Sequence, residues 1–225
     1  MSTFVPRQLA LSLDHAERLT REDFLRGPSN DIALSMIESW PDWPARAMVL
    51  AGPSGSGKSH LAAIWAAESG ARFLSARALA QTHLPETLTT GALVVEDVGE
   101  NLDERAMFHL LNLARQENAW LLLTATQLPA QWKVALPDLA SRLRAIPAFT
   151  LASPDDALLR AVLVKLFADR QLAVDEGLIG YLTSRIERSF AAARAVVAML
   201  DEEALRRQRS VNRALAAELL RDNAV

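Results

Sequence analysis

Hydrophobic positions follow different patterns in the two parts of this chain. In the first part, short continuous apolar runs alternate with segments of helical spacing, and such runs predict buried strands of a parallel sheet. The predicted strands lie at 47–51, 72–75, 91–97, 119–126 and 149–152. The predicted helices lie at 31–40, after a cap at Ser29 or Asn30, and at 58–69, 76–82, 103–117 and 137–145, with a polar loop after residue 82. This alternation predicts a three-layer α/β domain, in which helices cover both faces of a parallel sheet.

From residue 153 onward the strand pattern stops, and every segment has helical spacing. The sequence at 153–156, Ser-Pro-Asp-Asp, is typical of a helix start with a cap and a proline in the first turn. The predicted helices lie at 154–169, 175–186, 189–208 and 211–222. We therefore expect three parts, namely an N-terminal segment at 1–20, an α/β domain at 21–152 and a small all-α lid domain at 153–225.

The first predicted strand leads into a glycine-rich loop that matches the phosphate-binding pattern G-x-x-x-x-G-K-[ST] at every fixed position. Its residues are Gly52, Pro53, Ser54, Gly55, Ser56, Gly57, Lys58 and Ser59. Glycines let successive N–H groups turn inward, and the following helix adds its positive N-terminal end. Lys58 would reach the β- and γ-phosphates and Ser59 would ligate Mg²⁺, so the loop predicts a site for ADP or ATP. The competing interpretation is a glycine-rich turn without a ligand.

Two acids, Glu96 and Asp97, end the strand predicted at 91–97. Acids at the carboxyl end of a parallel strand are typical of the second nucleotide motif, where they hold Mg²⁺ and polarise the attacking water. The predicted metal ligands are therefore Ser59, Glu96 and Asp97. The alternative is a strand end that carries two solvated acids.

The N-terminal segment contains a short alternating pattern. Leu9, Leu11 and Leu13 would lie on one side of an extended backbone. This segment is either an edge strand of the domain or a linear peptide that docks in an apolar groove of a partner, with Gln8 making polar contacts.

Composition and charge narrow the range of functions. The chain has no cysteine, and its four histidines lack metal-ligand spacing, which argues against disulfides and a structural metal. With a net charge of −3 it offers no broad basic face to DNA, and the basic cluster at 206–209 is predicted to be a solvated helix face beside the acids at 201–203. No apolar run approaches the ~20 residues that cross a bilayer, and residues 1–13 lack a secretion signal, so we expect a cytoplasmic protein without a membrane partner.

The order of these motifs resembles that of the AAA+ ATPases and, within them, the DnaA-related family. The resemblance spans nearly the whole chain and is carried by the turn at 24–30, the phosphate loop, Glu96-Asp97, the strand end at 124–126 and the run at 136–143. The last run, Leu-Pro-Asp-Leu-Ala-Ser-Arg-Leu, is the most specific. It is similar to the Hda type of DnaA-homologous regulators of bacterial replication initiation.

This resemblance implies roles for further residues. Arg142 occupies the position of the arginine finger, a cation presented to the nucleotide of a neighbouring subunit, and Arg144 is the alternative. Arg194 matches the lid arginine called sensor 2, which reaches the bound phosphates. Thr126 falls at the sensor-1 position, and Asn30 with its turn would lie against the adenine.

The resemblance also implies partners. The segment at 8–13 is similar to a peptide that binds the sliding clamp, the β subunit of DNA polymerase III, which favours the docking interpretation of Gln8, Leu9, Leu11 and Leu13. The implied function is to promote hydrolysis of ATP bound to DnaA, which prevents over-initiation of replication. A homo-oligomer of this chain is a further option. The alternatives are an autonomous ATPase of the helicase-loader kind, like DnaC or IstB, and a DnaA-like scaffold for another partner.

Three departures from the family pattern change what is expected. The chain ends at Val225 after the lid helices, whereas DnaA continues into a helix-turn-helix domain, so no sequence-specific DNA binding is expected. Glu96 stands where the family usually has Asp, and Thr126 replaces an acidic residue. The last two departures predict weak ATP hydrolysis by the chain itself.

Overall fold

A computed structural model describes residues 19–99 and 102–222 of the chain. The α/β part contains α1 (Asp31–Glu38), β1 (Ala47–Ala51), α2 (Lys58–Ser69), β2 (Arg72–Ser75), the 3₁₀ helix η1 (Ala76–Gln81), α3 (Leu84–Thr87), β3 (Ala92–Val98), α4 (Glu104–Gln116), β4 (Trp120–Ala125), the 3₁₀ helix η2 (Pro129–Gln131), α5 (Pro137–Ala145) and β5 (Ala148–Thr150). All five predicted strands are present.

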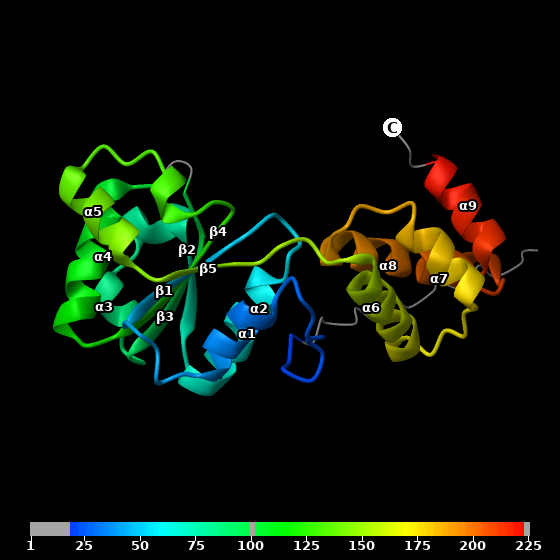
Figure 1. The fold of residues 1–225 in the computed structure, drawn as a ribbon, viewed down its shortest axis with the longest axis horizontal. Coiled ribbons are helices and arrows are strands. Elements are labelled where there is room, and N and C mark those ends of the chain that lie inside the picture. Colours follow the sequence, from blue (N-terminus) through cyan, green and yellow to red (C-terminus); the bar gives the residue numbers. More distant parts are fainter. Residues whose placement is uncertain (1–18, 100–101, 223–225) are drawn as a thin grey trace, which may run out of the picture.

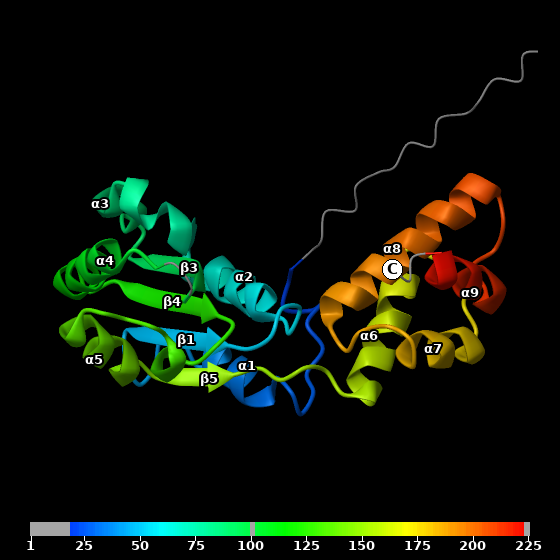
Figure 2. The same ribbon diagram turned by 90° about the horizontal axis from the view of Figure 1, so that it is seen from above.

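Within the described residues, these five strands form one parallel sheet in the order β2-β3-β4-β1-β5. The parallel sheet predicted from the continuous apolar runs is therefore confirmed. Because the strands are parallel, their carboxyl ends share one edge, and Figure 2 shows this edge facing the helical part of the molecule. The loops that leave this edge are the ones that can meet the helical part.

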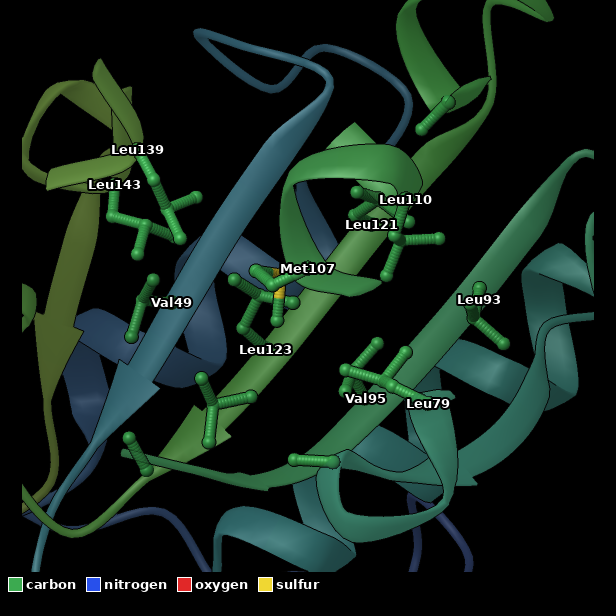
Figure 3. Close-up of a cluster of buried hydrophobic side chains, with 14 of the residues drawn as sticks. Val49, Leu79, Leu93, Val95, Met107, Leu110, Leu121, Leu123, Leu139 and Leu143 are labelled. Carbon is green, nitrogen blue, oxygen red and sulfur yellow. The ribbon is translucent and has the colours of Figure 1, made fainter. Parts of the chain in front are cut away.

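Helices cover both faces of the sheet, which gives three layers. On one face η1, α4 and α5 enclose an apolar cluster in which Met107 and Leu110 of α4 lie over Leu123 and Leu121 of β4 (Figure 3). On the other face, α1 and α2 enclose a second cluster that contains the fully buried Trp65. The acids and the glycine-rich loop lie at the sheet edge between these two layers.

The helical part consists of α6 (Asp156–Asp169), α7 (Glu176–Thr183), α8 (Phe190–Arg207) and α9 (Arg213–Asp222). Asp155, Asp175 and Ser189 cap the first three, each accepting a hydrogen bond from a backbone N–H in the first turn. These helices pack around their own apolar cluster, separate from the two clusters of the α/β part (Figure 1). None of the helices in the described ranges is long and apolar enough to span a membrane.

Three details differ from the predictions. The loop expected after residue 82 contains the short helix α3, which begins with a proline near its N-terminus. The last strand covers Ala148–Thr150 instead of 149–152, although Leu151 still donates its N–H to the carbonyl of Ala51 at 2.8 Å. Asn30 does precede α1 as predicted, but its side chain makes no capping hydrogen bond.

The basic cluster near the end of α8 is a solvated helix face, as predicted. Arg206 and Arg207 lie 2.6 and 2.7 Å from Glu203, and Arg207 also reaches Glu218 of α9 at 2.6 Å. The bond of Arg206 is exposed and contributes little to stability, whereas the two bonds of Arg207 are partly buried. Both arginines are therefore paired with acids of the same helical part.

Candidate nucleotide site

The glycine-rich loop joins β1 to α2 at the edge of the sheet that faces the helical part. Gly52 donates its N–H to the carbonyl of Ala125 in β4 at 3.1 Å, so the loop continues the sheet before it turns. Gly55 and Gly57 have φ values of 71° and 101°, which side chains rarely adopt. Gly57 is the residue that precedes α2, which begins at Lys58. The predicted order of strand, loop and helix is confirmed.

The side chain of Lys58 reaches back to the first residues of this loop. Its side chain is 8% exposed, and its Nζ donates hydrogen bonds to the carbonyls of Gly52 and Pro53 at 2.7 and 2.8 Å. Burial lowers the pKa of Lys58, and the negative charge of Asp97 opposes this shift. A phosphate oxygen could replace both carbonyls as the partner of Nζ, and it would bring a negative charge that neutral carbonyls lack.

The floor of the loop is tightly packed. A side chain on Gly52 would collide with the carbonyl oxygen of Leu151. Ser56 is 1% exposed, and its Oγ has no hydrogen-bond partner among the described residues. A buried hydroxyl without a partner is uncommon, and a ligand in the loop is one way to satisfy it.

The two predicted acids lie at an irregularity near the carboxyl end of β3. Val95 pairs with Leu123 and Val98 with Ala125, so Glu96 and Asp97 together occupy the space opposite one residue of β4. Glu96 is half-buried, whereas Asp97 is exposed and has a φ of 57°. Asp97 is also the acid whose charge acts on Lys58. Val98, which follows Asp97, pairs with Ala125, and the carbonyl of Ala125 accepts the N–H of Gly52, so Asp97 lies beside the start of the phosphate loop.

The single residue opposite the acids is Thr124, which the sequence analysis did not assign to the site. Its Oγ1 accepts a hydrogen bond from the N–H of Asp97 at 3.2 Å, and the residue is 1% exposed. The available signal was a threonine inside a strand that is otherwise apolar, because buried hydroxyls usually have a partner.

The predicted sensor-1 residue Thr126 follows β4 and is exposed. Ser59 is exposed in the first turn of α2.

The helical part contacts the phosphate loop directly through the start of α8. Phe190 donates its backbone N–H to the carbonyl of Gly55 at 2.9 Å. A Cβ on Gly55 would lie 2.9 Å from the Cβ of Ser189 and 3.0 Å from that of Ala191. Gly57 faces the rings of both Phe24 and Phe190. The absence of side chains at these two glycines therefore permits α8 to approach the loop.

Arg194 lies one helical turn beyond this contact, on α8, and is half-buried. The helix that carries the predicted sensor-2 arginine thus begins on the phosphate loop.

Asn30 is 2% exposed, and its amide organises the preceding turn. Its Oδ1 accepts from the N–H of Gly27 at 2.9 Å, and its Nδ2 donates to the carbonyl of Leu25 at 3.0 Å. The side chain therefore shapes the turn that was predicted to lie against the adenine.

The segment at 20–27 contacts both α2, the helix that follows the phosphate loop, and α6 of the helical part. The carbonyl of Thr20 lies 2.7 Å from Nε2 of His60 in α2. Asp23 accepts a hydrogen bond from Nζ of Lys165 in α6 at 2.7 Å. This segment therefore contacts α2 on one side and α6 on the other, and we call it the strap.

The Asp23–Lys165 contact predicts a pH-dependent stability. The hydrogen bond from Lys165 lowers the pKa of Asp23, and the hydroxyl of Thr20 adds to this effect. The resulting stabilisation is complete above the ordinary pKa of 3.8 and is lost as the pH falls through the lowered value. We expect Asp23→Asn to reduce the free energy of unfolding by about 1 kcal/mol at pH 7 and by much less at pH 3.

Denaturant unfolding at the two pH values measures this difference. Asp169→Asn is the matched control, because Asp169 bonds the same Nζ at 2.7 Å but belongs to the same helix as Lys165. An equal loss of unfolding free energy in both variants would mean that the contact between the strap and α6 stabilises the fold no more than the contact within α6 does.

Arg142 lies on α5, which packs on the face of the sheet opposite α2 and lies away from it in both views (Figures 1 and 2). Its guanidinium contacts Asp138 at 2.9 Å and Asn112 at 2.7 Å, and lies 4.7 Å from the ring centre of Phe108. Arg144, on the same helix, is exposed. Neither arginine is brought to the phosphate loop of its own chain.

The predicted partner-binding residues Gln8, Leu9, Leu11 and Leu13 lie outside the described residues.

Comparison with solved structures shows which fold this is. Domain III of the Thermotoga maritima replication initiation protein DnaA matches with a TM-score of 0.75 and 16% identity, covering 91% of this chain and 96% of that one. AMPPCP-bound DnaA from Aquifex aeolicus matches with a TM-score of 0.66 and 18% identity over 85% and 69% of the two chains. The RuvB Holliday junction branch migration motor of Thermotoga maritima matches with a TM-score of 0.69 and 16% identity over 90% and 71%.

No protein-family model and no curated protein sequence matches the chain. The structural likeness confirms the predicted fold, a three-layer α/β domain with a parallel sheet followed by a small helical part, as in domain III of DnaA.

Proposed function

We propose that the chain binds ADP or ATP in the loop Gly52 to Ser59. The observation that carries this proposal is the loop itself, which has the complete phosphate-binding sequence, a helix that begins at Lys58, and a buried lysine bonded to its first two residues. The hydroxyl of Ser56, which has no hydrogen-bond partner among the described residues, favours a polar ligand in the loop. The AMPPCP-bound DnaA structure, which shares the fold, supports an adenine nucleotide.

Mg²⁺ is the metal that this set of residues fits. Ser59, Glu96 and Asp97 offer hard oxygen ligands, and Mg²⁺ is usually held by one or two carboxylates together with the phosphates of the substrate. Among the described residues there is no cluster of three or more acidic or histidine side chains that could hold a metal without the nucleotide. The metal would neutralise charge on the phosphates when the nucleotide is bound.

We further propose that the chain acts in bacterial replication as an Hda-type regulator of DnaA. It would dock on the sliding clamp through Gln8, Leu9, Leu11 and Leu13 and present Arg142 to ATP held by DnaA. The position of Arg142 supports this role, because an arginine away from its own phosphate loop can reach only the nucleotide of another subunit. Its contacts with Phe108 and Asn112 hold the guanidinium in one orientation.

The second candidate is an autonomous ATPase of the helicase-loader kind. The position of Asp97 beside the start of the phosphate loop favours it, because an acid near the phosphate loop is what a chain needs to hydrolyse its own ATP. Glu96 in place of the usual aspartate argues against efficient turnover, since its longer side chain changes the distance to a metal-bound water.

Hydrolysis of DnaA-bound ATP separates these candidates. We would measure it with and without this chain, with clamp loaded on DNA or clamp omitted, and with ADP or ATP added to the chain. Stimulation that requires the clamp supports the regulator. Steady turnover by the chain alone, without an effect on DnaA, supports the loader-type ATPase. The absence of nucleotide binding would contradict both.

A further inference from the structure

Glu96 and Asp97 of β3 lie opposite a single residue of β4, so the pairing of the two strands has one extra residue on the β3 side. Leu123 and Ala125 of β4 pair with Val95 and Val98, which leaves Thr124 opposite Glu96 and Asp97. A bulge of this kind bends the strand and re-aims a side chain. Without it, the alternation of a regular strand would determine where the carboxylate of Asp97 points.

The bulge takes the N–H of Asp97 out of the backbone hydrogen bonding between β3 and β4, and the side chain of Thr124 provides a replacement acceptor. Its Oγ1 accepts from the N–H of Asp97 at 3.2 Å. Asp97 has a φ of 57°, a left-handed conformation that costs free energy for a residue with a side chain. The hydrogen bond offsets this cost, because it satisfies an N–H that would otherwise lose its partner.

The same part of β4 also holds the start of the phosphate loop. Thr124 pairs with Leu50 of β1, and the carbonyl of the next residue, Ala125, accepts the N–H of Gly52. One short stretch of β4 therefore fixes both the loop and the bulge. The N–H groups of Asp97 and Gly52 therefore bond to adjacent residues of β4, which places the bulge beside the start of the phosphate loop.

We propose that Thr124 is a positioning residue, which holds the bulge that directs Asp97 toward the phosphate loop and so makes nucleotide binding respond to Mg²⁺. This inference rests on the proposed nucleotide binding and deepens it. Thr124 acts through the backbone of Asp97, because its hydroxyl is buried in the sheet and is bonded to that backbone.

The test compares Thr124→Val, which keeps the shape and loses the acceptor, with Thr124→Ser, which keeps the acceptor. Calorimetry gives the affinity for AMPPCP with Mg²⁺ and with EDTA, and the ratio of the two is the gain from the metal. We expect this gain to be about 10-fold smaller in Thr124→Val, which corresponds to the loss of one hydrogen bond, and to be retained in Thr124→Ser. Thermal unfolding verifies that both variants are folded.

A second measurement needs no nucleotide. We expect the amide hydrogen of Asp97 to exchange faster in Thr124→Val than in the parent or in Thr124→Ser, because its acceptor is gone. Unchanged exchange would overturn the proposed role of the hydroxyl, even if the chain bound nucleotide as proposed.

Other outcomes have equally definite meanings. A uniform loss of affinity that leaves the gain from Mg²⁺ unchanged would show that Thr124 is merely structural. A parent chain that binds AMPPCP equally with and without the metal would also overturn the inference. A parent that binds no nucleotide would refute the proposed function instead, while altered exchange at Asp97 would still support the contact.

Discussion

Replacing Arg142 with alanine is expected to abolish the stimulation of ATP hydrolysis on DnaA. An arginine finger offsets charge on the transferred phosphoryl group, and in other P-loop systems its removal costs about 10³–10⁵ in rate. The variant should bind nucleotide like the parent, because α5 and α2 lie on opposite faces of the sheet. Single-turnover hydrolysis of radiolabelled ATP on DnaA, with clamp loaded on DNA, measures the effect.

The same substitution should leave the fold intact. The contact of Arg142 with Asp138 is an exposed ion pair, and its bond to Asn112 is also exposed, so we expect a stability loss below about 1 kcal/mol. Arg144→Ala is the matched control, since Arg144 belongs to the same helix and is exposed. If Arg144→Ala abolished stimulation while Arg142→Ala retained it, the finger would have to be reassigned to Arg144.

Replacing Lys58 with methionine is expected to lower the affinity for ADP about 10–100-fold. A hydrogen bond to a charged group contributes about 1.5–3 kcal/mol, and Nζ of Lys58 lies at the loop opening where phosphate would bind. Calorimetry on the parent and the variant measures the change. Lys133→Met, at an exposed position in another loop, should bind ADP like the parent.

The nucleotide-free Lys58→Met variant should keep a free energy of unfolding within about 1 kcal/mol of the parent. Burial lowers the pKa of Lys58, which means that the charged form is disfavoured in the fold, and removing the charge relieves this cost. The variant also loses two hydrogen bonds to backbone carbonyls, and the two effects oppose each other. A large loss of stability together with unchanged ADP affinity would mean that Lys58 is a structural lysine.

The pH dependence of ADP binding provides an independent check on Lys58. Below its lowered pKa the side chain is protonated and can donate to phosphate, so affinity is complete there. As the pH rises through that value, binding must take up a proton and affinity falls. Because the pKa is below its ordinary value of 10.5, the decline should begin at a lower pH than for an exposed lysine, and Lys58→Met should not show it.

Local sequence patterns predicted much of this fold. Continuous apolar runs such as 119–126 identify buried parallel strands, and the loop motif identifies the turn into α2, because both depend on neighbouring residues. Gly70, a glycine with a φ of 71°, follows the last residue of that helix, which ends at Ser69 as the predicted range 58–69 has it. The start of the helical part was also marked locally, but two residues too early: the cap is Asp155 and α6 begins at Asp156, so Pro154 precedes the helix instead of lying in its first turn.

Contacts between distant segments were not predictable in this way. The bond between Asp97 and Thr124 joins residues that are 27 positions apart, and it depends on the register of β3 against β4. The docking of Phe190 on Gly55 depends on how the helical part packs against the loop. The sequence therefore predicted candidate residues for the chemistry, whereas their supporting contacts required the three-dimensional structure.

The contact between Phe190 and Gly55 couples the start of α8 to the phosphate loop. The helix has 18 residues, which corresponds to a length of about 27 Å, and it touches the phosphate loop only in its first turn among the contacts described above. If α8 turned together with α6 and α9, which pack against it, a displacement of 1 Å across that first turn would become about 5 Å at the other end of α8. Because α9 packs against α8, a small change in the loop would be amplified into a movement on the far surface of the molecule.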